Sequence, residues 1–222
     1  ALYSMVDTII VGQFMGSAGI SAINNSGQIL NIVTKIAIGV TTGGNIIIGQ
    51  YYGAKDLRSR HQASGTLFSL SLLCGLAAAA GLYFGASPLL GILGAPSMAE
   101  AMAYLQICAV GMVPVFGYNA LAAVLRGVGD SRTPLNIILL STLVNLGLDV
   151  WLVGPMQMGV SGAALATTIS QLLSFLLALG ALARKQYQSV YIMMGINELG
   201  YPVESYRSGL SKLLERVIEI QP

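Results

Sequence analysis

The chain has 222 residues, of which 55% are hydrophobic and only 9% are charged, and its formal net charge is +2. Soluble globular domains usually carry about 25% charged residues, so the composition excludes an ordinary soluble domain. The small net charge and the lack of a basic stripe interleaved with aromatics exclude a nucleic-acid-binding face. Short bursts of charge separate apolar stretches of about 20 residues, the length that a helix needs to cross a bilayer. The sequence therefore predicts an all-α membrane protein with several spans.

Six apolar segments are predicted to be transmembrane helices. They cover residues 1–12, 20–48, 63–84, 104–125, 135–153 and 160–183. At about 1.5 Å per residue the first covers about 18 Å of an apolar core that is about 30 Å thick, so we expect a truncated first helix. Lys35 and the Gly43-Gly44 pair interrupt the second segment. Pro114 predicts a kink in the fourth, because proline leaves a helix carbonyl without its donor.

The distribution of basic residues predicts how the bundle is oriented, because Lys and Arg collect in short cytoplasmic loops. The basic residues that follow the second, fourth and sixth segments are Lys55, Arg58, Arg60, Arg126, Arg132, Arg184 and Lys185. The alternate loops contain no basic residue. We therefore expect a multi-pass protein of the plasma (inner) membrane with both chain ends in the cytoplasm. Residues 1–185 are predicted to form the six-helix domain, and residues 186–222 a cytoplasmic linker that ends in a short amphipathic helix.

The first and last helical hairpins resemble each other. Residues 7–12 and 149–154 both follow the pattern D-x-x-x-V-G, and matching glycines and a glutamine follow one inserted residue later. Internal repeats of this kind are common in transporters. Because the two helices run in the same direction, Asp7 and Asp149 are expected at similar depth, about one helical turn inside the extracellular end.

The two aspartates are candidate functional residues, because a carboxylate at mid-helix costs about 2.5 to 3.5 kcal/mol on insertion scales. Asn145 lies four residues before Asp149 and shares its helix face, Thr142 extends that polar face, and Thr167 lies in the sixth segment. Carboxylate, amide and hydroxyl oxygens suit a small hard cation, and a desolvated carboxylate equally suits a proton. The alternative is that each aspartate is solvated near the outer headgroups or caps a neighbouring helix.

A second group of residues is a candidate for the lining of an apolar, adaptable cavity. It comprises Tyr3, Met5, Met112, Phe116 and Tyr118. The alternative is that these side chains are ordinary core or interface residues. Lys35, the other charge within a helix, is interpreted as reaching the interface or pairing with another helix, with a substrate-binding role as the alternative.

The sequence gives no support to an enzyme. Cys74 and Cys108 lack a second Cys or a His at metal-ligand spacing, so we expect neither a zinc site nor a cofactor. The G-x-S-G string around Ser161 suggests an intramembrane serine protease, which needs a histidine base within about 3 Å of the serine. His61, the single histidine, is predicted at the cytoplasmic face and Ser161 at the extracellular one. The protease interpretation is therefore disfavoured.

Six ordered motifs resemble those of one transporter family. They read YSMVDTIIVG, GQYYGAKD, YLQICAVGMVP, LRGVGDSRTP, NLGLD and GVSGAALATTISQ. In order and spacing they are similar to the MATE (multidrug and toxic compound extrusion) transporters, over nearly all of residues 1–185. The resemblance implies one six-helix lobe, the N-terminal one, of a twelve-helix transporter that exports organic cations and other drugs in exchange for Na⁺ or H⁺. It also implies the bilayer, amphipathic or cationic small molecules and a missing C-terminal lobe as partners.

The resemblance also assigns roles to individual residues. Asp7 resembles the family's first-helix acid, whose protonation is proposed to bend that helix in DinF-like members. The other residues that resemble the cation site, for Na⁺ or a proton, are Asn145, Asp149 and Thr167. Tyr3 falls where a cavity-lining tyrosine is found, and Met5 and Met112 are candidates for the same substrate cavity.

The chain departs from the family pattern in two respects. The 222 residues are expected not to include the start of the first helix, where many members have a helix-bending proline, nor the second lobe. The tail LLERVIEIQP resembles the stretch that leads into a seventh helix, so this fragment is expected to be incomplete as a transporter. A related flippase for lipid-linked oligosaccharides or lipids is the alternative function. Many charges around a central cavity would favour it, whereas only Lys35 and the two aspartates are available.

Overall fold

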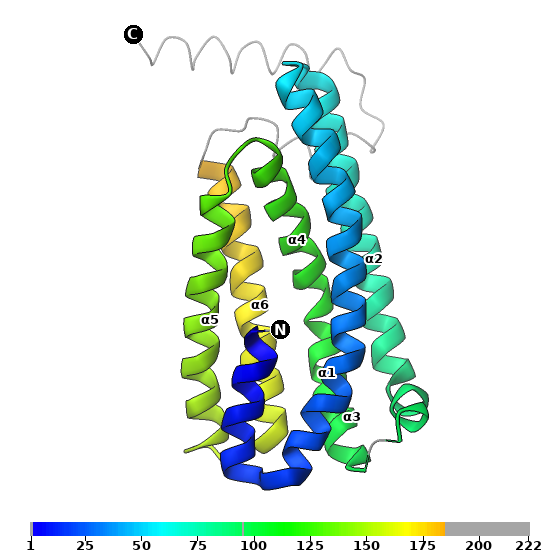
Figure 1. Ribbon diagram of the computed structural model, residues 1–222, viewed down its shortest axis with the longest axis vertical. Helices are drawn as coiled ribbons and strands as arrows, with labels where there is room; N and C mark the ends of the chain where they lie inside the picture. Colours follow the sequence, from blue (N-terminus) through cyan, green and yellow to red (C-terminus); the bar gives the residue numbers. More distant parts are fainter. Residues whose placement is uncertain (1, 95, 185–222) are drawn as a thin grey trace, which may run out of the picture.

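A computed structural model describes residues 2–94 and 96–184, with the side chains of residues 2–9, 14, 15, 17 and 18 left out of the description. The described chain is helical and contains no strand. The helices are α1 Leu2–Gly53, α2 Leu57–Ile92, α3 Met98–Val110, α4 Met112–Gly127, α5 Arg132–Val153 and α6 Gly159–Arg184. They run roughly side by side along the long axis of one bundle (Figure 1). The predicted linker, 186–222, and Lys185 lie outside the described residues.

The six predicted apolar segments are all helical, so the predicted all-α six-helix class is confirmed. The first two segments are the two arms of α1, which change direction at Gly16 (φ 67°, ψ −150°), a conformation that favours glycine. Lys35 and the Gly43-Gly44 pair interrupt the apolar pattern of the second segment but do not break its helix, which runs from Gly19 to Gly53. Isolated glycines weaken a helix by about 1 kcal/mol each, but a segment in lipid must satisfy its own backbone hydrogen bonds and so stays helical.

The fourth predicted segment is bent, as expected, but not at the proline itself. It forms α3 and α4, which meet at an angle of 43° around Gly111. Pro114 has no N–H to donate to the carbonyl of Val110, four residues earlier, so the helix loses a hydrogen bond one turn before the proline ring. The bend therefore falls at the glycine that precedes Met112.

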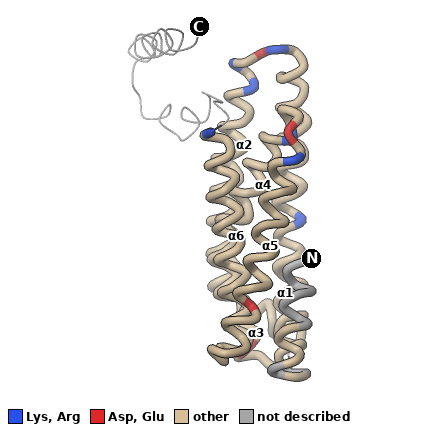
Figure 2. The backbone as a smooth tube through the Cα atoms, turned by 90° about the vertical axis from the view of Figure 1, so that its left-hand side faces the viewer, with Lys and Arg blue, Asp and Glu red and all other residues tan. Residues whose placement is uncertain are grey.

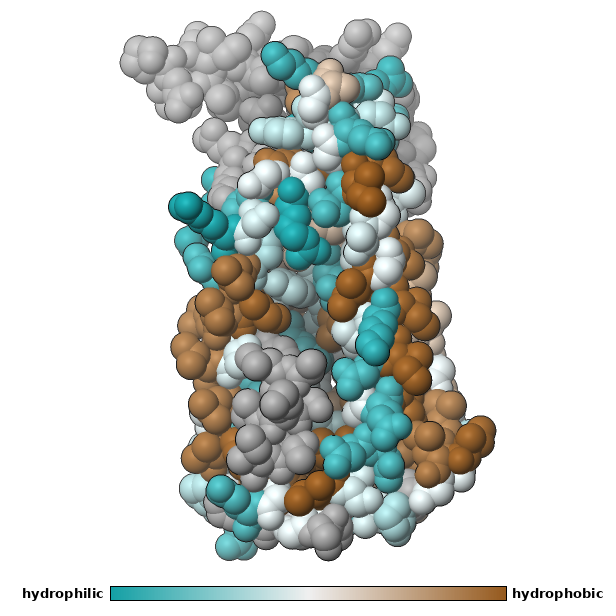
Figure 3. All heavy atoms as spheres, in the orientation of Figure 1, coloured by the Kyte–Doolittle hydropathy of each residue, from teal (hydrophilic) through white to brown (hydrophobic). Residues whose placement is uncertain are grey.

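The outer surface of the bundle is apolar. Within the described residues, four helices are long and apolar enough to cross a membrane, and the bent α3–α4 pair would be a fifth span if it counts as one. Large apolar side chains such as Phe84 (81% exposed) and Leu143 (66% exposed) point outward, and apolar residues flank the visible face in Figure 3. A surface of this kind is stable in lipid but not in water. The described residues thus form a multi-pass membrane bundle.

The basic residues gather at one end of the bundle (Figure 2). This end carries the α1–α2 loop, the α4–α5 loop and the end of α6, where Lys55, Arg132 and Arg184 are exposed. The opposite end carries the Gly16 turn, the α2–α3 loop and the α5–α6 turn. The exception is Lys35, which is exposed within α1. We call the end that carries the α1–α2 loop, the α4–α5 loop and the end of α6 the basic end.

Candidate functional site

The inward face of α5 carries a row of polar side chains. Ser141, Asn145 and Asp149 follow one another at intervals of four residues, and each is 0% exposed. Their spacing places them on one side of the helix, which also buries Ile137 and Leu152. A carboxylate sealed from solvent in this way is stable when it is protonated or when a cation neutralises it.

Asn145 connects α5 to α6. Its Nδ2 donates a hydrogen bond to Oγ1 of Thr167, at 3.3 Å, in a fully buried position. Its Oδ1 accepts no hydrogen bond from any group in the described part of the chain. An acceptor oxygen is therefore available beside Asp149, on the same helix face, to accept a hydrogen bond from a ligand or to coordinate a cation.

The structure brings together three of the four predicted cation-site residues: Asn145 and Asp149 on one face of α5, and Thr167 opposite them on α6. The fourth, Asp7, lies outside the described side chains, as do Tyr3 and Met5 of the predicted substrate cavity. The nearest described residues of the first arm of α1, Ile10 and Val11, belong to the same buried cluster as Val153 and Val160. This arm therefore packs against the end of α5 and the start of α6.

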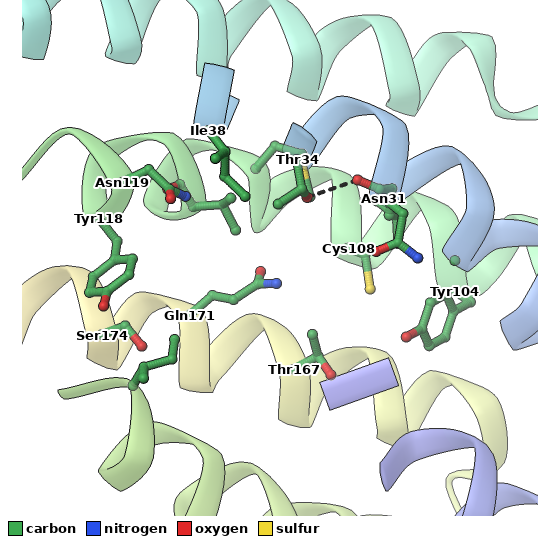
Figure 4. Close-up of a pocket in the computed structure, with 15 residues that line it drawn as sticks. Asn31, Thr34, Ile38, Tyr104, Cys108, Tyr118, Asn119, Thr167, Gln171 and Ser174 are labelled. Atoms are coloured by element: carbon green, nitrogen blue, oxygen red, sulfur yellow. Dashed lines mark hydrogen bonds between the residues drawn. The ribbon is translucent and has the colours of Figure 1, made fainter. Parts of the chain in front are cut away.

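A cavity of about 250 Å³ lies between α1, α3, α4, α5 and α6. Its described lining carries no charged residue and combines apolar side chains with amides and hydroxyls. Tyr118 and Tyr104 lie toward its two ends, and Gln171 reaches into the space between them (Figure 4). Met112, predicted as a cavity residue, is part of this lining, whereas Phe116 lies in the core beside Gly75 of α2.

Thr167 of α6 both lines the cavity and contacts the polar face of α5. It is one of the cavity-lining residues, and its hydroxyl accepts the hydrogen bond from Asn145. Two other hydroxyls of the region have different partners: Thr142 donates to the Ile138 carbonyl of its own helix, and Thr168 donates to the Ile107 carbonyl of α3. Thr167 therefore links Asn145 to the wall of the cavity.

Sequence reasoning missed much of the polar lining of the cavity. Asn31 and Thr34 of α1, Asn119 of α4, and Gln171 and Ser174 of α6 all line it. The signal was present in α6, because residues 167, 171 and 174 recur at helical spacing on one face of an otherwise apolar segment. In α1, Asn31 and Thr34 likewise stand at helical spacing, whereas Asn119 of α4 belongs to no such repeat and its orientation emerges only from the packing.

The described residues contain no group of three His, Cys, Asp or Glu side chains that could hold a metal ion. The oxygen set of Asp149, Asn145 and Thr167 fits a hard monovalent cation or a proton better than a transition metal. His61 is the fifth residue of α2, which begins at the basic end, and Ser161 is the third residue of α6, which begins at the opposite end (Figure 1). The pairing that a serine protease needs is thus absent from the described bundle.

Comparison with known proteins assigns this fold. The MatE family model matches residues 1–151. The chain is 32% identical over 181 residues to the probable multidrug resistance protein YpnP of Bacillus subtilis (strain 168), covering 80% of this chain and 40% of that protein. It is 29% identical over 189 residues to the probable multidrug resistance protein YoeA of the same organism, covering 82% and 41%. The chain thus spans about two-fifths of the length of these relatives.

Solved structures show the same architecture. A crystal structure of MATE in the bent conformation superimposes with a TM-score of 0.81 at 24% sequence identity, over 85% of this chain and 42% of that one. At this identity the likeness establishes the fold, and the family match over residues 1–151 establishes the kinship. The chain belongs to the MatE family of MATE transporters.

Proposed function

We propose that this chain forms the N-terminal lobe of a secondary transporter that exports amphipathic or cationic small molecules in exchange for Na⁺ or H⁺. Its curated relatives named as probable multidrug resistance proteins support export of this class of compound. Because the chain spans about two-fifths of those relatives, we assign the transport cycle to the complete protein and the coupling site to this lobe.

The observation that carries the proposal is the double role of Thr167. The cation, as a transported substrate, is held by Asp149, by the available Oδ1 of Asn145 and by Thr167, with Asp7 as the further acid. Occupation of the site reorients the Asn145–Thr167 hydrogen bond and with it one wall of the cavity. Substrate affinity therefore depends on the cation, and cation affinity depends on the substrate to the same extent.

The lining of the cavity fits the proposed substrates. Apolar side chains dominate it, the aromatic rings of Tyr104 and Tyr118 offer π faces to a flat organic cation, and amides such as Gln171 and Asn119 supply adaptable hydrogen bonds. The uncharged described lining does not favour the alternative of a flippase for charged lipid-linked sugars.

The electrochemical gradient supplies enough free energy for efflux. One net charge that moves inward across about 100 mV, as in one-for-one exchange with a neutral substrate, releases about 2.3 kcal/mol, which sustains roughly a fiftyfold substrate gradient. For a singly charged substrate the same exchange moves no net charge, and the concentration difference of the coupling cation supplies the free energy. Inward movement of the cation toward the basic end requires this end of the bundle to face the cytoplasm, as the positive-inside rule predicts.

Transport in liposomes tests the proposal. The natural protein that carries this chain, complete as it is encoded, is reconstituted, and efflux of a fluorescent aromatic cation such as ethidium is driven by a Na⁺ or a pH gradient. Asp149→Asn is expected to abolish cation-driven efflux, because it removes the buried carboxylate. Glu100→Gln, the same chemical change in the first turn of α3, is expected to leave it intact. Undiminished efflux by Asp149→Asn contradicts the proposed role.

A further inference from the structure

The packing of α5 against α6 fixes which of their residues lie level with one another. The two helices are antiparallel (Figure 1). Asn145 hydrogen-bonds Thr167, and a Cβ placed on Gly162 would lie 3.2 Å from the carbonyl of Leu152. The two contacts give registers that agree to within two residues, and in each of them a step back along α5 is matched by a step forward along α6. Ser141 is therefore level with residues 171–173 of α6, within one helical turn of Ser170.

Both serines also lie on the sides of their helices that face each other. Ser141 shares a face with Asn145, four residues on, and that face meets α6. On α6, Leu177 borders a groove together with Leu140 of α5, and Ser170, seven residues earlier, lies on the same side. The other side of α6 meets α3 and α4, because Thr168 bonds the Ile107 carbonyl of α3 and Gln171 contacts Gly111.

The hydroxyls of these two serines are sealed in the interface without a hydrogen bond. Both residues are 0% exposed, and neither Oγ has a partner in the described part of the chain. Ser174 and Thr142 instead donate to carbonyls of their own helices, as hydroxyls in membrane helices commonly do. Two facing hydroxyls and the available Oδ1 of Asn145 provide the several polar partners that a buried water or a small cation requires.

The position of the pair indicates a role in cation movement. Asp149, Asn145 and Ser141 succeed one another at intervals of one turn toward the basic end, and the next residue in the row is the buried Ile137. Beyond it, an open groove of about 600 Å³ between α5 and α6 is lined by Thr133, Asn136 and Arg184. The positive charge of Arg184 makes that groove a poor resting place for a cation, whereas the serine pair is neutral and enclosed.

We propose that Ser141 and Ser170 form a hydrated station on the route of the coupling cation between Asp149 and the basic end, with Ile137 as the apolar barrier to the groove. This inference rests on the proposed function, because it assigns a path to the cation that Asp149 binds. Water held by the two hydroxyls solvates the Na⁺ or relays the proton as it leaves Asn145 and Thr167. The pair is thus a positioning element and does not contact the exported substrate.

Replacement of both hydroxyls tests the route. In the reconstituted natural protein, Ser141→Ala with Ser170→Ala is expected to slow cation-driven efflux about tenfold at saturating substrate, since two polar partners are lost. The dissociation constant for ethidium without the coupling cation is expected to stay unchanged. The matched control is Ser71→Ala, because Ser71 is equally buried and its hydroxyl is equally without a described partner, but it lies on α2. Equal slowing by the control, or unchanged efflux by the double variant, overturns the inference.

The rate of thiol labelling tests whether water and cations reach the two positions, which a purely structural role for the serines does not require. With Cys74 and Cys108 replaced by alanine, Ser141→Cys and Ser170→Cys are expected to react with the small cationic reagent MTSEA, more slowly when Na⁺ or acid loads the site. Ser71→Cys is expected to stay unlabelled, and equal reactivity of all three contradicts a hydrated route. If Asp149→Asn abolishes exchange while the serine variants behave as wild type, this inference alone fails. If Asp149→Asn has no effect, the proposed function fails.

Discussion

Thr167 lies in two environments at once, a buried polar contact on one side and an open cavity on the other. Its hydroxyl is the acceptor for the amide of Asn145, at 3.3 Å, and its side chain contributes to the cavity wall. A threonine suits this position because its β-branched shape fills space between helices while its oxygen stays available for bonding. The residue therefore contributes to both the stability of the α5–α6 hairpin and the proposed coupling.

Thr167→Val keeps the shape of the side chain and removes the oxygen. The Nδ2 of Asn145 then loses its acceptor in a fully buried position, which is expected to lower the free energy of unfolding by about 1–3 kcal/mol. Thermal unfolding of the purified natural protein in detergent measures the change. Thr142→Val is the control, because that hydroxyl bonds a carbonyl of its own helix and its loss should cost less than about 0.5 kcal/mol. Equal losses for the two variants would contradict the assigned contact.

Part of this site could be predicted from residue spacing. Asn145 and Asp149 are four residues apart in an apolar segment, which is enough to place them on one face. The contact with Thr167 depends on the register between two helices, and spacing within one helix does not determine it. The inward orientation of Asn31 and Asn119 depends on how α1 and α4 are rotated in the bundle, which the packing of distant glycines and aromatics decides.

The bend between α3 and α4 is tightly packed around Gly111. A Cβ placed on Gly111 would overlap Oε1 of Gln171 and lie 3.1 Å from the Cys108 carbonyl. The backbone of Gly111 is helical, at φ −66°, so the requirement for glycine at this position is steric rather than conformational. Pro114 therefore accounts for the kink in this segment, whereas the space available to residue 111 at the corner depends on Gln171 and Thr168 of another helix.

Gly111→Ala is expected to lower the free energy of unfolding by about 1 kcal/mol, since the flexible end of Gln171 must move aside and the Cys108 carbonyl lies 3.1 Å from the added Cβ. Adding Gln171→Ala should recover part of the loss, because the overlapping atom is removed. Gly147→Ala on α5 serves as the reference, since an added Cβ there meets nothing within 4 Å. Chemical or thermal unfolding of the four proteins measures the effects, and a Gly111→Ala protein as stable as Gly147→Ala would refute the steric role.

The start of α2 is capped by a titrating side chain. Asp56 accepts a hydrogen bond from the Ser59 backbone N–H, at 3.0 Å, and its hydrogen bonds with Ser59 hold the pKa of this exposed carboxyl below its ordinary value. A lowered pKa in the folded state means that the cap contributes stability above the ordinary pKa of an aspartate, and that this contribution is lost as the pH falls through the folded value.

Amide hydrogen exchange in the first turn of α2 measures how much the Asp56 cap stabilises that turn. Amides in the first turn of α2 are expected to exchange faster, relative to the intrinsic rate, when the pH is lowered from 6 to about 3, the acidic side of the aspartate titration. Asp56→Asn keeps an acceptor but no longer titrates, so the same amides should show little pH dependence of protection. A wild-type pH dependence in that variant would show that another group is responsible.

Over the whole molecule, hydropathy sufficed to predict the six helical segments because each apolar stretch must satisfy its own backbone in lipid. It did not predict that the first two segments form one element with a turn at Gly16, nor that α2 extends from Leu57 to Ile92. Those features depend on a local glycine conformation and on helix ends that lie beyond the apolar core. The gathering of basic residues at one end followed from the alternation of basic and non-basic loops.

The orientation of the bundle is open to a direct test. Ser131→Cys lies in the exposed α4–α5 loop at the basic end, and Met156→Cys in the exposed α5–α6 turn at the opposite end. With Cys74 and Cys108 replaced by alanine, a membrane-impermeant maleimide applied to intact cells is expected to label Met156→Cys directly. Ser131→Cys should be labelled only after the membrane is opened. The reverse pattern would place the basic end outside the cell and contradict inward cation movement toward it.

Coupling between the polar face of α5 and the cavity is measured most directly as the dependence of equilibrium substrate affinity on the coupling cation. The affinity of the purified natural protein for ethidium is determined by fluorescence anisotropy across a series of Na⁺ concentrations and pH values, for the wild type and for Asp149→Asn. The wild type is expected to bind ethidium about tenfold more weakly when Na⁺ or acid loads the site, a coupling free energy of about 1.4 kcal/mol. Asp149→Asn should bind ethidium with an affinity independent of the cation. An Asp149→Asn protein that keeps the full cation dependence would contradict the assignment of coupling to this site.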